Sequence, residues 1–337
     1  MPKQLIDFSV NLNPFGTLPS IKGNWVNWID IIEDYPDPDG YRLIQAIVAR
    51  EQICQSHILL GNGGAELITL LANFLTKKRI GIVQPTFIEY EKMCRAFQCD
   101  IEHIVLQEGK WHDLSAVYPI IKDIDALFLC HPNNPTGITY NKETLRKLIE
   151  QCEQEQCYLI IDEAFYDFAE EFESAVSYVS AHQYVIVIRS LTKMYSIAGL
   201  RLGYMMGPKE VISSLKDIQP HWSINSIALE AGIHCLDSEA FVMKTRKYIA
   251  NERKKMQVAL EEMGFNVSKS DVNYLLIRDD TLHNQEPIIR YLLQKGIVPR
   301  HTENYRGLNG KWIRVAIKKE KENELLLKAL QSWKRRN

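Results

Sequence analysis

The sequence has 337 residues, of which 46% are hydrophobic and 24% charged, and this length can form one large domain plus a smaller one. Its formal net charge is only −2, so neither a nucleic acid nor an anionic membrane is an expected partner. The N-terminus lacks a signal segment, no apolar run reaches the roughly 18 residues that span a bilayer, and the cysteines and histidines lack metal-site spacing, so we expect a cytoplasmic protein without a metal.

The first 40 residues are expected to form an extended arm, after which strands and helices alternate. Short runs that are apolar throughout, as buried parallel strands are, occur at residues 79–85, 126–132, 157–165 and 184–190. Between them lie stretches of helical period, such as residues 141–156, in which apolar side chains share one face. This order predicts an α/β sheet covered by helices on both faces, in a large domain over residues 41–235.

The final third of the chain has a different pattern. A long charged helix is predicted from about Phe241 to Gly264, a glycine typical of helix C-termini. The segment at residues 265–280, a second helix near residues 286–296, a strand-like segment at residues 311–317 and a terminal helix then follow. Because these elements are fewer, we predict a smaller α+β domain over residues 236–337.

Two turns could contact a ligand. The segment LGNGGAELI, residues 60–68, places glycines just before a predicted helix, whose free backbone N–H groups and dipole could receive a phosphate. The segment HPNNPTG, residues 131–137, places Asn134 at the carboxyl end of a predicted strand, where open α/β sheets bind ligands. Each segment could instead be only a turn.

Two charged residues also follow buried strands. Asp162 comes directly after a run of aliphatic residues, and a buried carboxylate is costly without a partner. Lys193 follows the next strand, and a nucleophilic lysine must be partly neutral near pH 7, which burial favours. Alone, Lys193 could be an ordinary surface lysine. Together, a phosphate-binding turn, an asparagine, an aspartate and a lysine in this order fit a pyridoxal phosphate site.

These residues resemble, over nearly the whole chain, the class I/II aminotransferase family of fold-type I pyridoxal-phosphate enzymes. The resemblance implies the aspartate aminotransferase-like fold, with a large, mostly parallel seven-stranded sheet domain and a small α+β domain. It also implies pyridoxal 5'-phosphate as the cofactor. The residues it assigns are Ser190 and Lys193 of S-x-x-K, with Lys193 bonded to the cofactor, Arg201 at the phosphate, Gly64 and Ala65 capping the phosphate, Asn134 of NPTG at the phenolic oxygen and Asp162 of D-x-A-[YF] at the ring nitrogen.

The resemblance extends to two aromatic residues. Phe87 in PTFIEY occupies the position of the residue that stacks on the cofactor ring. Tyr35 in YPDPD is similar to the tyrosine that reaches the phosphate of the neighbouring subunit's cofactor. A homodimer with active sites at its interface is therefore implied.

Two branches of the family share these motifs. Threonine-phosphate decarboxylases of cobalamin biosynthesis resemble the chain in DFSVNLNPFG, YPDPDGYRL, HWSINSIALEAG and NYRGLNGKWIRVAI, and histidinol-phosphate aminotransferases are the alternative. In the decarboxylase branch, the arginine matching Arg314 holds the substrate carboxylate and the one matching Arg300 holds the substrate phosphate, assisted by Asn11. Guanidinium groups suit both anions. On their own, Arg300 and Arg314 could be a solvent-exposed pair beside a strand.

Two differences from the family patterns bear on the reaction. Phe165 stands where most of the aminotransferases have a tyrosine, which agrees with the decarboxylase branch. The His-Gly-Gly-Asn segment of that branch has no counterpart here, so its contact with the substrate phosphate is not expected. The leading hypothesis is a lyase that decarboxylates L-threonine O-3-phosphate, and the rival is an aminotransferase that uses 2-oxoglutarate. A non-catalytic binding module of the same fold is a third, remote hypothesis.

Overall fold

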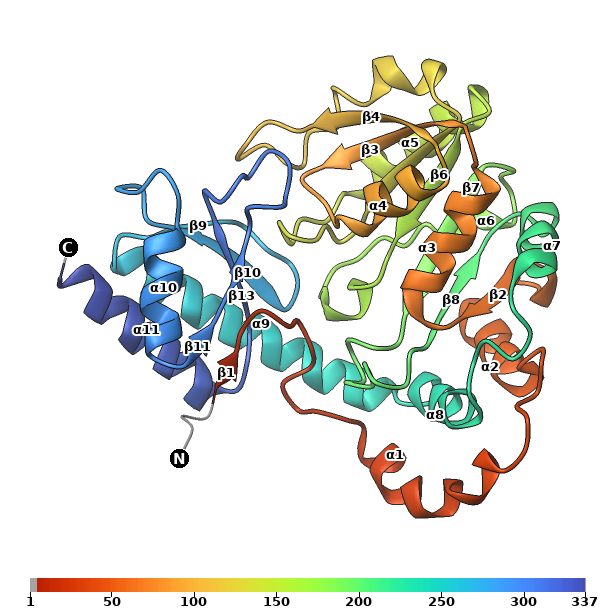
Figure 1. Ribbon diagram of the computed structural model, residues 1–337, viewed down its shortest axis with the longest axis horizontal. Helices are drawn as coiled ribbons and strands as arrows, with labels where there is room; N and C mark the ends of the chain where they lie inside the picture. The colour runs from red at the N-terminus through yellow and green to blue at the C-terminus, as the bar shows by residue number, and fades with distance from the viewer. Residues whose placement is uncertain (1–4, 337) are drawn as a thin grey trace.

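The largest feature of the fold is a seven-stranded sheet in which only β8 runs against the other strands (Figure 1). The computed structural model describes residues 5–336, so residues 1–4 of the predicted arm and residue 337 of the predicted small domain lie outside the described residues. The predicted large, mostly parallel sheet is confirmed. Its strands, in spatial order, are β2 (Ile58–Gly61), β8 (Gly203–Met206), β7 (Val185–Ser190), β6 (Tyr158–Asp162), β5 (Ala126–Cys130), β3 (Arg79–Gln84) and β4 (Asp100–Val105).

Successive side chains on a strand point to opposite faces of a sheet. Because these side chains are apolar on both faces of this sheet, helices cover both faces. In β6, Leu159 and Ile161 belong to one apolar core and Ile160 to the other. The core of Ile160 includes α3 (Gly63–Phe74), α4 (Glu89–Ala96) and α7 (Lys209–Ile218). The other core includes α2 (Tyr41–Glu51), α5 (Lys142–Gln154), α6 (Val176–Val179) and α8 (Ser226–Leu236).

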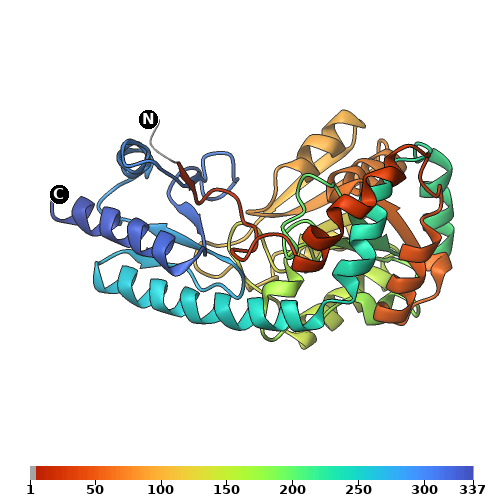
Figure 2. The same cartoon turned by 90° about the horizontal axis from the view of Figure 1, so that it is seen from below.

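The C-terminal third forms a smaller lobe around an antiparallel sheet (Figure 1). The order of its strands is β12 (Arg300–His301), β13 (Ile313–Ala316), β10 (Tyr274–Arg278) and β9 (Asn266–Val267). Its helices are α9 (Glu239–Glu262), α10 (Glu286–Gln294) and α11 (Glu320–Lys334). Figure 2 shows α9 reaching from this lobe towards the large one, where Arg246 donates to the carbonyl oxygen of Asp167 at 2.9 Å.

The N-terminal arm links the two lobes and is less extended than the sequence suggests (Figure 1). It begins with β1 (Ile6–Asp7), which pairs in parallel with β11 (Ile297–Val298) of the small lobe. A short helix and two 3-10 turns follow: α1 (Pro19–Asn24), η1 (Trp25–Trp28) and η2 (Asp30–Ile32). Three further 3-10 segments lie in the large lobe: η3 (Gln55–His57), η4 (Tyr118–Asp123) and η5 (Tyr166–Phe168).

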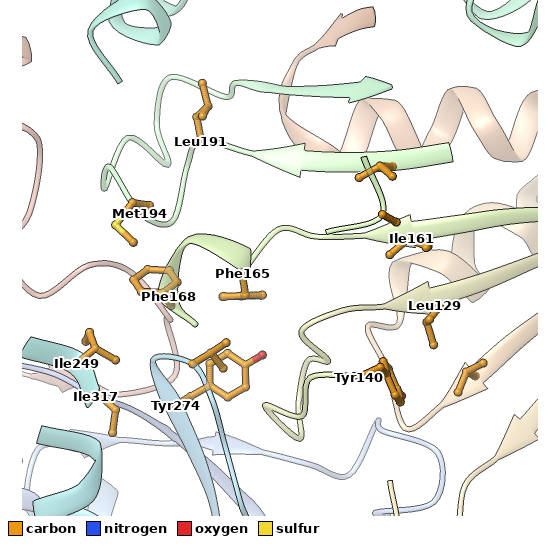
Figure 3. Packing of buried hydrophobic residues seen from close by; sticks show 14 of the residues in the cluster. Leu129, Tyr140, Ile161, Phe165, Phe168, Leu191, Met194, Ile249, Tyr274 and Ile317 are labelled. Carbon is orange, nitrogen blue, oxygen red and sulfur yellow. The ribbon is translucent and has the colours of Figure 1, made fainter. Parts of the chain in front are cut away.

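The two lobes share an apolar contact beside the ends of β6 and β7. Figure 3 shows Phe165, from the segment after β6, close to Tyr274 of β10, with Phe168 beside it. The rings of Phe165 and Tyr274 meet edge to face at 5.2 Å. The residue boundaries near 40 and 235 stay predictions, and the second falls at the C-terminal end of α8, just before α9. Within residues 5–336, no helix has the length and apolar character needed to cross a membrane.

Candidate active site

The candidate site is built at the carboxyl ends of three adjacent parallel strands. Asp162 is the last residue of β6 and Ser190 the last of β7, while Asn134 follows β5. These strands neighbour one another in the order β7, β6, β5, with Cys130 paired to Asp162 and Asp162 paired to Ile188. The topology therefore brings together side chains that are far apart in the sequence, at the place where open α/β sheets bind ligands.

Lys193 lies in this site rather than on the surface. Its Nζ donates a hydrogen bond to Ser190 Oγ at 3.0 Å, and the Phe165 ring centroid is 5.8 Å away. Burial lowers the pKa of the Lys193 amine; the nearby Asp162 carboxylate opposes this shift, and Arg201 adds to it. The neutral, nucleophilic form of the amine is therefore more accessible than in a lysine exposed to water.

Both carboxylate oxygens of Asp162 are held by donors. Oδ2 accepts a hydrogen bond from the Tyr90 hydroxyl at 2.6 Å, and Oδ1 accepts one from the Ala164 backbone N–H at 2.9 Å. Burial and the nearby Asp162 raise the pKa of Tyr90 well above its usual value, so its hydroxyl keeps its proton and remains a donor. Tyr90 had no predicted role. It lies in α4, three residues after Phe87, but this spacing does not indicate where its hydroxyl group points.

The predicted phosphate end combines the start of α3 with Arg201. Gly63 has a positive φ of 72°, and a Cβ added to it would lie 2.6 Å from Arg201 Nη2. The positive φ favours glycine, and any side chain here would displace the end of the Arg201 side chain. Gly64 and Ala65 lie in the first turn of α3, where backbone N–H groups have no partner within the helix. A positive side chain beside free amide groups fits a bound phosphate.

Asn134 contacts Arg314. The sequence left open that Arg314 is exposed to solvent on one face of its strand, but the side chain is buried. Arg314 is 6% exposed, and its Nη1 donates to Asn134 Oδ1. Its Nη2 donates to the Ser9 carbonyl oxygen at 2.7 Å, which ties the N-terminal arm to the site. Burial lowers the pKa of Arg314, and the nearby tyrosines Tyr274 and Tyr305 oppose the shift. A desolvated guanidinium group of this kind is a strong partner for a bound anion.

The second predicted anion contact, Arg300, lies directly opposite Arg314. The two are paired across strands β12 and β13, and Arg300 Nη2 donates to Asn304 Oδ1 at 3.0 Å. Asn11 is buried, and within residues 5–336 its Oδ1 has no hydrogen-bond partner. The Asn11 side chain makes no direct bond to either arginine in the described chain, so its substrate role stays a prediction.

The two aromatic residues differ in placement. Phe87 is half-buried and packs its ring edge to face on Tyr90, with centroids 5.8 Å apart. Tyr35 is 80% exposed and lies against Trp222, at 4.6 Å, with no bond or ring contact to the other predicted site residues in the described chain. The described chain therefore places Phe87, the residue predicted to stack on the cofactor ring, beside Tyr90 and leaves Tyr35 away from the other predicted site residues.

A buried ionic cluster that the sequence analysis did not foresee lies beside the site. Arg189 Nε is 2.9 Å from Glu163 Oε2, and its Cζ lies 3.3 Å from the centroid of the Tyr166 ring. Glu51 of α2 is 3.8 Å from Arg189 and accepts a hydrogen bond from the Tyr204 hydroxyl at 2.7 Å. Glu163 follows Asp162 and Arg189 precedes Ser190, so the cluster fixes the two strand ends that carry site residues.

Known proteins are similar to this chain over nearly its whole length. A family model described as aminotransferase class I and II matches residues 3–330. The chain is 36% identical to the threonine-phosphate decarboxylase of Salmonella typhimurium over 335 residues, which cover 98% of this chain and 92% of that protein.

Solved structures show the same similarity. The histidinol-phosphate aminotransferase from Clostridium acetobutylicum has a TM-score of 0.94 and 31% identity, and the match covers 99% of this chain and 100% of that one. An aspartate aminotransferase mutant from Thermus thermophilus, 22% identical, has a TM-score of 0.88 over 99% of this chain and 96% of that one, which confirms the aspartate aminotransferase-like fold. Because both the family model and these relatives span almost its full length, the chain belongs to the aminotransferase class I and II family.

Proposed function

We propose that this protein is a pyridoxal-phosphate enzyme that acts on a small phosphorylated amino acid, with decarboxylation of L-threonine O-3-phosphate as its reaction. The observation that carries the proposal is the desolvated Lys193 amine, which lies near Asp162 and Arg201 at adjacent strand ends. The similarity to threonine-phosphate decarboxylase along 98% of the chain supports this choice of substrate and reaction.

The residues of the site fit pyridoxal 5'-phosphate. Lys193 would bond to its aldehyde carbon, and the carboxylate of Asp162, already oriented by two donors, would face its ring nitrogen. The Asn134 amide would donate to its phenolic oxygen, and Phe87 would stack on the ring. When bound, this cofactor accepts the electron pair of a bond that breaks at the substrate Cα.

The phosphate of the cofactor would be held at the start of α3. Gly64 and Ala65 supply backbone N–H groups, Ser190 a hydroxyl group and Arg201 the positive charge. The contact that Gly63 permits with Arg201 supports this placement, because a side chain at that position would push the guanidinium group away.

The substrate would be held by its two anionic groups. Arg314 is the candidate for the carboxylate, since it lies beside Asn134 and is desolvated. Arg300, on the neighbouring strand, is the candidate for the substrate phosphate, with Asn11 in support. Lys193 Nζ would then carry the proton to or from Cα, because its lowered pKa makes it able both to accept and to return one.

A specific observation also favours an aminotransferase as the second candidate. The histidinol-phosphate aminotransferase from Clostridium acetobutylicum matches this chain with a TM-score of 0.94 at 31% identity. The same lysine could move a proton at Cα in either reaction. The difference lies in whether the substrate carboxylate is retained or released, which depends on how Arg314 orients it.

We further propose that the active unit is a cytoplasmic homodimer, in which Tyr35 of each subunit reaches the cofactor phosphate of the other. Tyr35 is 80% exposed in the single chain, and the segment before it exposes the apolar side chains of Trp25, Val26, Ile29 and Ile32. A second copy would bury this segment and complete both sites.

The test is to incubate the purified, cofactor-loaded protein with L-threonine O-3-phosphate, and separately with histidinol phosphate and 2-oxoglutarate. Carbon dioxide from the first reaction supports the decarboxylase; glutamate from the second, with no carbon dioxide from the first, overturns it in favour of the aminotransferase. Lys193→Ala should abolish the visible absorbance of the bound cofactor, whereas Lys122→Ala, at an exposed position, should keep it. A wild-type protein that takes up no cofactor would contradict both enzymes and favour the binding module.

A further inference from the structure

Tyr305, a residue to which the sequence analysis gave no role, lies among three predicted site residues. It belongs to the loop between β12 and β13 and is 3% exposed. Its backbone N–H donates to the Thr302 carbonyl oxygen at 3.1 Å, and its own carbonyl oxygen accepts from Leu308 at 3.0 Å. The loop therefore holds the side chain in one place.

The Tyr305 hydroxyl group joins Asn134 to Arg314. It donates to Asn134 Oδ1 at 3.3 Å and accepts from Arg314 Nη1 at 3.5 Å, while Arg314 Nη1 also donates to Asn134 Oδ1. An amide oxygen has two lone pairs, so both are used. Within residues 5–336, no hydrogen bond is formed by Asn134 Nδ2. The amide is therefore held with its oxygen towards Tyr305 and Arg314 and its two N–H donors free for a ligand.

The ring of the same residue lies beside Arg300. The Arg300 guanidinium carbon is 5.6 Å from the Tyr305 ring centroid, within the range of a cation–π contact. Arg300 and Arg314 face each other on paired strands, where like charges are unfavourable. Asn304, next to Tyr305, accepts from Arg300 Nη2 at 3.0 Å. One short loop thus supports both cationic groups.

We propose that Tyr305 is a positioning residue that couples the cofactor end of the site to the substrate end: its hydroxyl group orients the Asn134 amide and Arg314, and its ring supports Arg300. This inference rests on the proposed function, because it assigns Asn134 to the cofactor and the two arginines to the substrate anions. Loss of the hydroxyl group leaves Arg314 alone to hold the Asn134 oxygen and removes one contact of Arg314 itself, so both groups would be oriented less firmly.

The test compares Tyr305→Phe with Tyr140→Phe in the cofactor-loaded protein. Tyr140 is a matched control because it is equally buried and donates a hydrogen bond, to the Trp111 carbonyl oxygen at 3.3 Å, away from these groups. We expect Tyr305→Phe to raise KM for the phosphorylated amino acid about five- to tenfold, with a smaller change in kcat. We also expect the pH midpoint of the cofactor's visible absorbance to move by roughly half a pH unit. The control should change neither quantity.

A second variant, Asn304→Ala, separates the two halves of the proposal. Asn304 is exposed and contacts Arg300 but neither Asn134 nor Arg314, so the variant should raise KM without moving the absorbance midpoint. If Tyr305→Phe lowers only the thermal midpoint, as Tyr140→Phe does, and Asn304→Ala leaves KM unchanged, the coupling role is overturned while the proposed function stands. A wild-type protein that binds no cofactor overturns the proposed function and this inference with it.

Discussion

At the scale of single residues, the desolvated Lys193 amine has a measurable cost for the cofactor-free protein. Burial lowers the pKa of Lys193 below the usual value of 10.5, so the unfolded state binds more protons than the folded state at pH values between these two pKa values. The stability of the folded state should therefore rise with pH across that window. Below that window, the folded state carries the full free-energy cost of burying the charged Lys193 amine.

Lys193→Met should remove this cost. We expect the cofactor-free variant to unfold at a temperature roughly 2 °C or more above wild type at neutral pH, and the difference to shrink as the pH rises towards 10.5. Thermal unfolding followed by circular dichroism at several pH values measures it. Lys122→Met, at an exposed site, should show no such dependence. A variant less stable than wild type at every pH would contradict a desolvated amine.

The positions of the candidate cofactor residues could be foreseen, whereas the residues that orient them could not. Asn134, Asp162 and Lys193 each follow an apolar strand, and the carboxyl ends of adjacent parallel strands meet at one edge of a sheet. In the sequence, Tyr90 and Tyr305 cannot be distinguished from ordinary aromatic residues of a core or a loop. Their roles depend on where a single hydroxyl group points after the chain has packed, and no spacing in the sequence encodes that direction.

At the scale of secondary-structure elements, the ends of β6 and β7 are joined by the ion pair of Glu163 and Arg189. Both side chains are almost fully buried, so neither charge is compensated by water. Burial raises the pKa of the Glu163 carboxyl, and the Arg189 guanidinium group opposes this shift. Such a pair need not stabilise the fold more than apolar residues would, but removing one partner leaves an isolated buried charge.

Arg189→Met should therefore destabilise the protein strongly. We expect a loss of about 3–5 kcal/mol in the free energy of unfolding, because Glu163 and Glu51 both lose their cationic partner. Urea denaturation at constant cofactor concentration measures the loss. The matched control is Arg146→Met, whose pairs with Glu143 and Glu150 are exposed to water and should contribute little to the free energy of unfolding. Equal losses in the two variants would show that the buried cluster has no special role.

The sequence predicted some strands and helices and missed others. The predicted strands that became β3, β5, β6 and β7 are nearly all buried, and their continuous apolar runs reflect helices on both faces. The edge strand β4 was missed because most of its side chains are partly or fully exposed, and β2 and β8 because each has only four residues, one of them a glycine. The helical turns of the arm, α1, η1 and η2, are short and pack through few buried side chains, so no helical period marks them.

At the scale of the whole molecule, the N-terminal arm exposes several apolar side chains to solvent, which is unfavourable for a monomer. Trp25, Val26, Ile29 and Ile32 are each about half exposed or more, and Tyr35 continues the surface against Trp222. Contiguous exposed apolar side chains on a soluble protein usually mark an interaction surface. Because Tyr35 is also the residue whose predicted partner is missing from its own subunit, a second copy of this chain accounts for both observations.

Val26→Glu together with Ile29→Glu should therefore shift the protein from dimer to monomer, since two charges per subunit would have to be buried without partners. Sedimentation or light scattering at micromolar concentration would show the change in mass. The monomer should also bind the cofactor at least about tenfold more weakly, because each site would lose the proposed contact from Tyr35 of the other subunit. Leu325→Glu, which places a charge at a leucine of α11 about as exposed as Ile29, should leave both mass and cofactor affinity unchanged. A double variant that remains dimeric with full affinity would place the subunit interface on another face.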